Sequence, residues 1–343
     1  MKNLAIPLVI LNLVLHGFIP QAMAFHHGTQ YTISGTTMGT YYTIKFISRK
    51  KLSAVLWKQK VDILLNQVNQ TFSMYIAQSE LSRFNRRKPG AAFRTSPEFF
   101  KVLMTARTLY TITKGAWDGT VKPLVDLWGF GVKKAEDRIP DRIMIRKALA
   151  ETGFGHIYFP ADNMVAKDMD VTLDLGSIAK GYGVDAVAEL FMSWGIKDIL
   201  IEIGGELYGA GRNISGKDWV VGISRPDRKY ADQNLYQIVR LHGKAIATSG
   251  TYRNFFREGK KNFSHIIDPR TGFPVSGNIV SASVIAENCT FADGLATALM
   301  VMDIQKGIRL VNRLENTECL IIQKKGDRLV SHVSKNFTAL EVK

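Results

Sequence analysis

The sequence lacks the short motifs that mark several large enzyme classes. It contains no Gly-x-Gly-x-x-Gly fingerprint, no Walker-type phosphate loop and no Gly-x-Ser-x-Gly elbow. These absences argue against a nicotinamide dehydrogenase, a P-loop nucleotide hydrolase and a serine hydrolase of the elbow type. Internal repeats, heptad arrays and low-complexity linkers are also missing. The 343 residues are therefore predicted to form one compact unit rather than an array of modules.

Cysteine is scarce, with only Cys289 and Cys319 in the whole chain. Their spacing does not match that of a structural zinc site. Two readings stay open at this point. The two thiols could pair in an oxidising compartment, or they could remain buried and free in the apolar segments that surround them.

The first 24 residues have the features of a secretory signal peptide. Lys2 supplies positive charge, residues 4–15 form a short apolar run, and Ala22-Met23-Ala24 has the small-x-small pattern of a cleavage site. The apolar run is short for a membrane span, although an uncleaved anchor is the alternative. No cysteine follows the run, so no lipid anchor is predicted. We expect a mature protein of residues 25–343 in a bacterial periplasm.

Positive charge exceeds negative charge by 15, from 45 Lys and Arg against 30 Asp and Glu. The basic residues are scattered, and their densest runs, at 49–51 and 86–88, have no aromatic residues interleaved. This pattern favours a solvated surface over a nucleic-acid site. The excess charge could help to collect a polyanionic small molecule or an acidic partner.

Apolar periodicity predicts an α+β fold, a single compact unit of mixed or antiparallel sheets with packed helices. A helical lobe is predicted over residues 52–151. Interrupted β structure is predicted at 31–47, with the break at 35–40, and hairpins are predicted at 158–175 and at 319–333. The other predicted elements are helices at 52–72, 98–113, 121–128, 138–151 and 290–301, and strands at 219–224, 235–241, 244–250, 263–267 and 279–286.

The most informative stretch is residues 174–185, Asp-Leu-Gly-Ser-Ile-Ala-Lys-Gly-Tyr-Gly-Val-Asp. A strand at 170–175, a turn at Gly176, an N-cap at Ser177 and a helix to about Gly195 are predicted, followed by a strand at 199–203. A helix N-terminus beside a hydroxyl and Lys180 is a natural anion site. The alternative is an ordinary βαβ unit whose glycines allow close helix packing.

Asp293 and Thr297 are four positions apart and so share one face of the predicted 290–301 helix. With Ser177 they offer only oxygen ligands, which favours Mg²⁺ or Ca²⁺ over zinc. The alternative is structural, because Thr290-x-x-Asp293 also resembles a capping box. His265 is a candidate general base, although an isolated histidine is more often packed or hydrogen-bonded. Tyr75 and Trp117 could face a flat ring or pack in the core.

Taken in order, these segments resemble the ApbE family of FAD:protein FMN transferases. The resemblance covers nearly the whole mature chain and rests on specific motifs. They are Thr37-Met38-Gly39-Thr40, Ser73-x-Tyr75, Ser79-x-x-Ser82-x-Phe84-Asn85, Gly115-Ala116-Trp117-Asp118, the run from Pro123 to Gly131, residues 174–182, Ile203-Gly204-Gly205, Ala247-Thr248-Ser249-Gly250, residues 264–272, and Ala292-Asp293-x-x-Ala296-Thr297.

The resemblance implies an ApbE-like, T-fold-related core and Mg²⁺-dependent transfer of FMN from FAD to a threonine hydroxyl of a partner protein, with release of AMP. The partners it implies are flavoprotein subunits of membrane redox complexes. By position it implies FAD contacts at Met38, Tyr75, Ala116, Trp117, Asp118, Asp174, Lys180 and Ile267. It implies a metal site at Ser177, Asp293, Ala296 and Thr297, where Ser177 and Ala296 could act through their carbonyl oxygens.

The sequence departs from many family members at one place, because Phe25 stands where a lipidated cysteine is expected. This favours a freely diffusing, exported enzyme. Two other functions stay open. Water could replace the threonine, which would make the protein a Mg²⁺-dependent FAD pyrophosphatase, or the protein could bind flavin without turnover.

Overall fold

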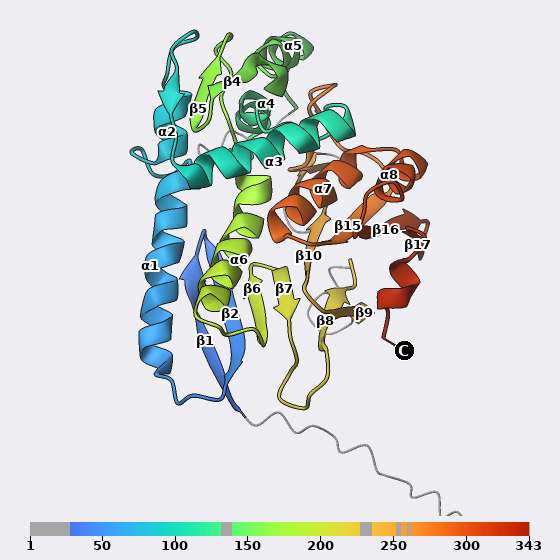
Figure 1. Ribbon diagram of the computed structural model, residues 1–343. Helices are drawn as coiled ribbons and strands as arrows, with labels where there is room; N and C mark the ends of the chain where they lie inside the picture. The colour runs from blue at the N-terminus through green and yellow to red at the C-terminus, as the bar shows by residue number, and fades with distance from the viewer. Residues whose placement is uncertain (1–27, 132–138, 227–234, 252–254, 259–260, 343) are drawn as a thin grey trace, which may run out of the picture.

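An eight-stranded sheet runs through the molecule in the order β1-β2-β6-β7-β10-β15-β16-β17 (Figure 1). The structure is a computed structural model that describes residues 28–131, 139–226, 235–251, 255–258 and 261–342. All strand pairings among these residues are antiparallel. The sheet contains β1 (Thr29–Thr37), β2 (Thr40–Ser48), β6 (Ile199–Ile203), β7 (Glu206–Ala210), β10 (Lys244–Gly250), β15 (Ile279–Ala286), β16 (Glu318–Lys325) and β17 (Arg328–Val333).

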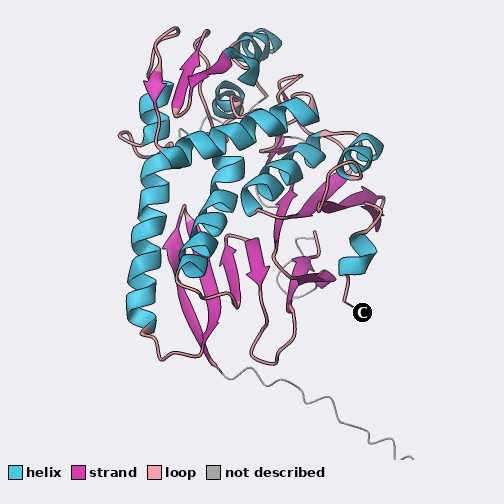
Figure 2. Ribbon diagram, in the orientation of Figure 1, coloured by secondary structure: helices cyan, strands magenta, loops and turns pink. Residues whose placement is uncertain are grey.

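Three long helices cover one face of this sheet (Figure 2). They are α1 (Ala54–Phe72), α6 (Gly176–Ser193) and α7 (Cys289–Val301), and α3 (Pro97–Thr113) crosses above them. The opposite face carries the two-stranded sheet of β8 (Trp219–Ser224) and β9 (Leu235–Leu241) and the short helix η2 (Phe337–Leu340). The predicted α+β class, with antiparallel sheets and packed helices, is confirmed.

The middle strands are apolar on both sides because both faces of the sheet are covered. On β10, Ala247 faces the helices while Ile246 faces β8 and β9. On β16, Ile321 and Ile322 divide in the same way. A strand buried on both faces reads as a continuous apolar run, which is why residues 279–286 could be recognised as a strand from the sequence.

The remaining elements are α2 (Glu80–Asn85), β3 (Phe93–Arg94), α4 (Lys122–Leu127), α5 (Arg142–Ala150), η1 (Phe154–His156), β4 (Ile157–Ala161), β5 (Met164–Lys167), β11 (Phe255–Glu258), β12 (Lys261–Ser264), β13 (Ile267–Asp268), β14 (Phe273–Pro274) and α8 (Ile304–Val311). Among them, α2, α4, α5, β4 and β5 lie in the upper part of the view in Figure 1.

The strand predicted at 170–175 is wrong, and so is the βαβ unit that it would have opened. The segment is extended, but its partner is a side chain. The Asn85 amide donates to the Leu173 carbonyl at 2.9 Å and accepts the Leu173 N–H at 2.8 Å. One asparagine thus satisfies the backbone groups that a neighbouring strand would otherwise pair.

The predicted helix cap at Ser177 is also wrong, and so is the capping box that was the alternative for residues 290–293. Helix α6 begins at Gly176, its N-cap is Leu175, and Ser177 lies inside the first turn. Helix α7 is capped by Asn288, whose side chain accepts the Phe291 N–H. The capping-box reading of residues 290–293 therefore fails, which leaves the Asp293 carboxylate available for another role.

Some predictions fall outside the described residues or stay untested. The predicted signal peptide lies in residues 1–27, which are not described, and the helical lobe at 52–151 stays a prediction. No helix in the described part of the chain is long and apolar enough to cross a membrane. Cys289 and Cys319 are both buried and free, which answers the question of pairing that the sequence left open.

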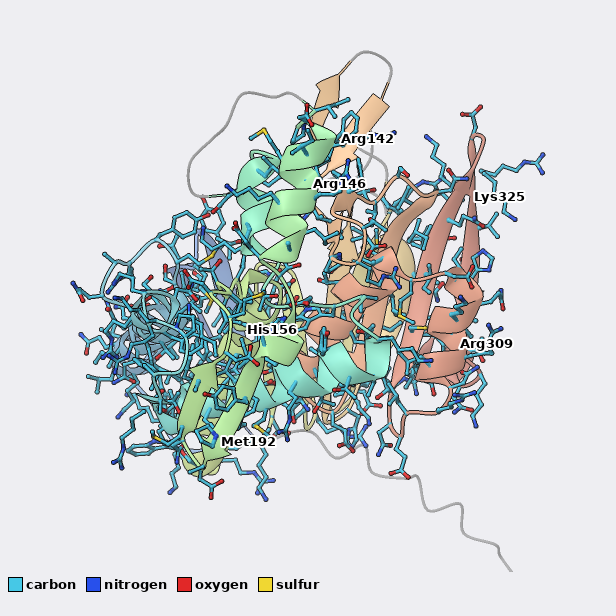
Figure 3. All side chains as sticks on the ribbon, turned by 90° about the horizontal axis from the view of Figure 1, so that it is seen from above. Arg142, Arg146, His156, Met192, Arg309 and Lys325 are labelled. Carbon is cyan, nitrogen blue, oxygen red and sulfur yellow. The ribbon has the colours of Figure 1, made fainter. Side chains whose placement is uncertain are left out.

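Positive charge is spread over the surface. Arg142 and Arg146 lie on α5, whereas Arg309 lies on α8 and Lys325 near the end of β16, on another side of the molecule (Figure 3). All four side chains are exposed. This agrees with the scattered pattern of basic residues in the sequence.

Lys167 is fully buried at the end of β5 and anchors the loop that leads into α6. Its ammonium donates to Asp170 Oδ1 at 2.9 Å, to the Val171 carbonyl at 2.9 Å and to the Asn85 carbonyl at 3.2 Å. We expect Lys167→Met to lower the free energy of unfolding by about 2 kcal/mol, because buried carbonyl acceptors lose their donor. Urea denaturation measures this difference.

The matched control is Lys101→Met. Lys101 pairs with Glu189 at 2.6 Å, but both side chains are more than half exposed. Exposed pairs contribute little, so the control should change the unfolding free energy by less than about 0.5 kcal/mol. Equal stability of the two variants would contradict the role assigned to Lys167.

Candidate functional site

A cavity of about 420 Å³ opens where α6 and α7 meet β10 and the β13 turn. Its wall combines charged, hydroxyl and aromatic side chains from segments that are far apart in the sequence. The residues that line it are Met74, Tyr75, Ala116, Trp117, Asp118, Val121, Val125, Phe130, Asp174, Gly176, Ser177, Lys180, Glu206, Thr248, Ser249, Gly250, His265, Ile266, Ile267, Pro269, Asp293, Thr297 and Val301.

Lys180 lies between two buried carboxylates in this wall. Its Nζ is 3.4 Å from Glu206 Oε1 and 3.6 Å from Asp293 Oδ2. Burial alone would lower the pKa of Lys180, but the charges of Asp293 and Glu206 more than offset burial, and the pKa is raised. The ammonium therefore stays charged at neutral pH. Burial raises the pKa of Asp293, and Lys180 and the Gly181 N–H partly offset this rise.

Gly181 allows α6 and α7 to approach closely enough for this arrangement. A Cβ at Gly181 would lie 2.4 Å from the Cys289 carbonyl oxygen, so any side chain would push the helices apart. The Gly181 N–H donates to Asp293 Oδ2 at 3.0 Å. Asp185 on α6 makes a second contact with α7, because its carboxylate accepts the N–H groups of Cys289 and Thr290 at the start of α7. The glycine in the helix thus positions the Asp293 carboxylate.

The β6–β7 turn brings Glu206 to the same place. Gly204 has φ of +64°, a conformation that L side chains rarely adopt, and a Cβ there would lie 2.8 Å from Thr40 and 3.3 Å from the Lys180 stem. The double glycine therefore lets the turn fold tightly against Lys180 and places Glu206 in the cavity wall.

Three oxygen-bearing residues line the same cavity as Lys180. Asp293 is 3% exposed, and among the described residues its Oδ1 accepts no hydrogen bond. Thr297 lies one turn further along α7, and its hydroxyl is 2.9 Å from that of Ser249. Ser177 Oγ accepts the Trp117 indole N–H at 3.0 Å. No cluster of three or more His, Cys, Asp or Glu able to hold a metal occurs in the described ranges.

Two further carboxylates in the wall are already engaged by backbone donors. Asp174 Oδ1 accepts the Gly176 N–H at 2.8 Å, which occupies one donor at the α6 N-terminus. Asp118 accepts the Thr120 and Phe154 N–H groups and holds the loop after α3. Burial raises the pKa of both carboxyls, and these hydrogen bonds oppose the rise. Asp174 thus occupies one donor of the helix end, and Lys180 is the one Lys or Arg among the described residues that line the cavity.

Aromatic side chains form another part of the wall. Trp117 is buried, with 2% exposure, whereas Tyr75 is 73% exposed. The Phe130 and His265 rings lie 6.3 Å apart and edge to face. Tyr75 therefore has an exposed ring, whereas Trp117 is buried and is held by its hydrogen bond to Ser177.

Most of the residues singled out from the sequence meet in this cavity. Met38 and Ala296 do not line it. Met38 lies at the β1–β2 turn with φ of +48°, and its side chain packs against α6 near Gly183. Ala296 is fully buried in the core. Those that line it are Tyr75, Ala116, Trp117, Asp118, Asp174, Ser177, Lys180, His265, Ile267, Asp293 and Thr297.

Sequence reasoning missed Glu206 and gave no role to Ser249, although both line the cavity. Glu206 had a signal that could have been used, because a carboxylate directly follows the Gly204-Gly205 turn at the start of an apolar strand. For Ser249, the only signal in the sequence was its position at the polar end of a predicted strand. Its contact with Thr297 spans 48 positions and is visible only in the folded chain.

With this geometry established, comparison with known proteins identifies the family. The ApbE family profile matches residues 38–321. The chain belongs to the ApbE family. Curated ApbE relatives named FAD:protein FMN transferase include those of Vibrio cholerae, 39% identical over 90% of this chain and 92% of the relative, and Escherichia coli, 35% identical over 92% and 91%.

Solved ApbE structures have the same fold. The flavin transferase ApbE of Vibrio cholerae superposes with a TM-score of 0.83 at 38% identity, covering 91% of this chain and 99% of the other. The apo flavinyl transferase ApbE of Pseudomonas stutzeri gives a TM-score of 0.83 at 32% identity, covering 91% and 97%. Membership of the family, which the motifs predicted, is thus confirmed over most of the chain.

Proposed function

We propose that this protein transfers FMN from FAD to a threonine hydroxyl of a partner protein and releases AMP. The observation that carries the proposal is the meeting of Lys180, Asp293 and Thr297 with aromatic side chains in one cavity. A flavin needs flat apolar contacts, and its diphosphate needs positive charge. The curated relatives are named FAD:protein FMN transferase, which supports transfer of FMN from FAD to a protein.

The reaction exchanges the phosphoanhydride bond of the FAD diphosphate for a phosphoester bond to threonine. The threonine oxygen forms a bond to the FMN phosphorus while the bond from that phosphorus to the AMP oxygen breaks. The threonine proton must leave, and AMP departs with the bonding electron pair. Lys180, held between Glu206 and Asp293 in the cavity wall, would neutralise charge on the phosphoryl oxygens as it develops.

A divalent cation such as Mg²⁺ fits the oxygen groups of the site. Mg²⁺ is bound in many enzymes by one or two carboxylates together with substrate phosphates and water. Asp293 and Thr297 would hold it together with the backbone carbonyl of Ser177. In a regular α-helix this carbonyl accepts the Gly181 N–H, but the Gly181 N–H donates to Asp293 instead. When bound, the cation would supply charge neutralisation at the diphosphate.

His265 is the proposed acceptor of the threonine proton. It lines the cavity just before the turn at Asp268-Pro269, and its ring lies against Phe130. A neutral imidazole within reach of the hydroxyl can serve as a general base. Among the described residues, the Asp268 carboxylate accepts two hydrogen bonds from the Arg270 side chain. Asp268 is therefore not assigned a role in orienting His265.

The acceptor is proposed to be a flavoprotein subunit of a redox complex, and the site of action the periplasm, on the basis of the predicted signal peptide. The decisive experiment incubates the purified chain with FAD, Mg²⁺ and a candidate acceptor. We expect in-gel flavin fluorescence on the acceptor and one AMP per FMN attached. Adding EDTA should abolish both signals, and excess Mg²⁺ should restore them.

Other results would point elsewhere. AMP and free FMN without a labelled acceptor, seen with every acceptor tried, would indicate a pyrophosphatase that uses water. Tight FAD binding without AMP release would indicate a flavin-binding protein. Full transfer in EDTA would contradict the proposed cation.

A further inference from the structure

The Thr297 hydroxyl has two oxygen neighbours on the protein. Ser249 Oγ lies 2.9 Å away on β10, and the Asp293 carbonyl lies 3.3 Å away, one turn back on α7. The second distance is at the long end for a hydroxyl donor. That carbonyl also belongs to the helix ladder, where it is the regular acceptor for the Thr297 N–H. Ser249 is therefore the better hydrogen-bond partner.

The direction of this hydrogen bond matters for cation binding. A hydroxyl has one proton and two lone pairs, and it binds a cation only through a lone pair. If the proton pointed into the cavity, it would repel a cation there. If Thr297 donates to Ser249, the proton points towards β10 and a lone pair is left for the cavity.

The large sheet holds the Ser249 backbone in place. Ser249 pairs with Ala282 of β15, and Ala247 and Gly250 on the same strand are buried, whereas Ser249 itself is half-buried. The α7 helix packs directly on β10 and β15. Residues that hydrogen-bond to metal ligands orient those ligands and tune metal affinity. Replacing such residues typically weakens metal binding by about 10–100-fold.

We infer that Ser249 is a positioning residue for the divalent-cation site: it accepts the Thr297 proton and so turns the hydroxyl lone pair towards the cation. This inference rests on the proposed function, since it assumes a cation at Asp293 and Thr297. It assigns a task to a residue that has no place among the predicted ligands. Ser249 itself need not touch the cation or the flavin.

The test measures binding of Mn²⁺, used in place of Mg²⁺, to the full chain with FAD present. Electron paramagnetic resonance of free Mn²⁺ reports binding without any turnover. We expect Ser249→Ala to weaken Mn²⁺ binding about tenfold. Ser249→Thr, which keeps a hydroxyl at this position, should stay within about threefold of the wild type.

Ser283→Ala is the matched control. The Ser283 hydroxyl lies 2.8 Å from that of Thr248, one position away on the same strand pair, and it does not line the cavity. The control removes the same kind of hydrogen bond from the same sheet, and it should leave Mn²⁺ affinity unchanged. Thermal unfolding of both alanine variants checks that they are equally folded.

The Thr297→Val variant tests whether Ser249 acts through the Thr297 hydroxyl. In Thr297→Val there is no hydroxyl left to orient, so adding Ser249→Ala should cause no further loss of Mn²⁺ affinity. Wild-type affinity in Ser249→Ala, or the same loss in Ser283→Ala, would overturn the role of Ser249 and leave the proposed function intact. A wild-type chain that binds no Mn²⁺ would instead contradict the proposed cation site itself.

Discussion

Replacing Asp293 by Asn is expected to slow FMN transfer by about a thousandfold, because one carboxylate carries the charge that would hold the cation. Asn keeps an oxygen that can accept the Gly181 N–H now bound at 3.0 Å, so the α6–α7 contact should survive. Single-turnover transfer from saturating FAD to the acceptor measures the rate. FAD affinity, measured by flavin fluorescence, should fall much less than the rate.

The control for this prediction is Asp185→Asn. Asp185 is another carboxylate between α6 and α7, and burial raises its pKa as it does for Asp293. It faces the start of α7 and does not line the cavity that contains Lys180. We expect lower thermal stability but a transfer rate within about twofold in the folded protein. Equal rates in Asp293→Asn and the wild type would remove the main support for a cation-assisted reaction.

Replacing Lys180 by Met is expected to lower kcat for FMN transfer by a factor of about 100–1,000, since the only lysine in the described cavity wall would be gone. The same change should reduce the free energy of unfolding by about 3 kcal/mol, because Asp293 and Glu206 would lose the ammonium between them. Steady-state kinetics with varied FAD and a urea titration measure the two effects.

Lys101→Met again serves as the control, because it removes one lysine from α3 that does not line this cavity. Its kcat should equal that of the wild type. The two effects of Lys180→Met can be separated by measuring kcat at a temperature where the variant is fully folded. A normal kcat under those conditions would mean that Lys180 has only a structural role.

Local sequence patterns predicted most elements well. Residues 98–113 have helical periodicity, and α3 is found at Pro97–Thr113. Residues 279–286 are apolar throughout, and β15 occupies that range because helices cover one face and β8–β9 the other. In both cases the pattern of apolar residues is contained within about 20 residues of sequence, and it reflects which side of the helix or strand is buried.

The extended segment at 170–175 shows where this reasoning fails. Its alternating residues predicted a strand, yet Asn85, 88 positions away from Leu173, takes the place of a partner strand. Ser177 similarly looked like a helix cap but is held by the Trp117 indole. Side-chain partners from distant segments overrule local propensity, and the sequence does not show them.

The sequence by itself determined the chemistry available to this protein: which residues carry oxygen ligands, which carry positive charge, and, through its motifs, the family. Only the tertiary structure decided that Lys180 and Asp293, 113 positions apart, lie 3.6 Å apart and that Glu206 and Ser249 join them. The physical reason is close packing. Gly181 and Gly204 lack the side chains that would keep these segments apart, and this condition is met only when all the segments are folded together.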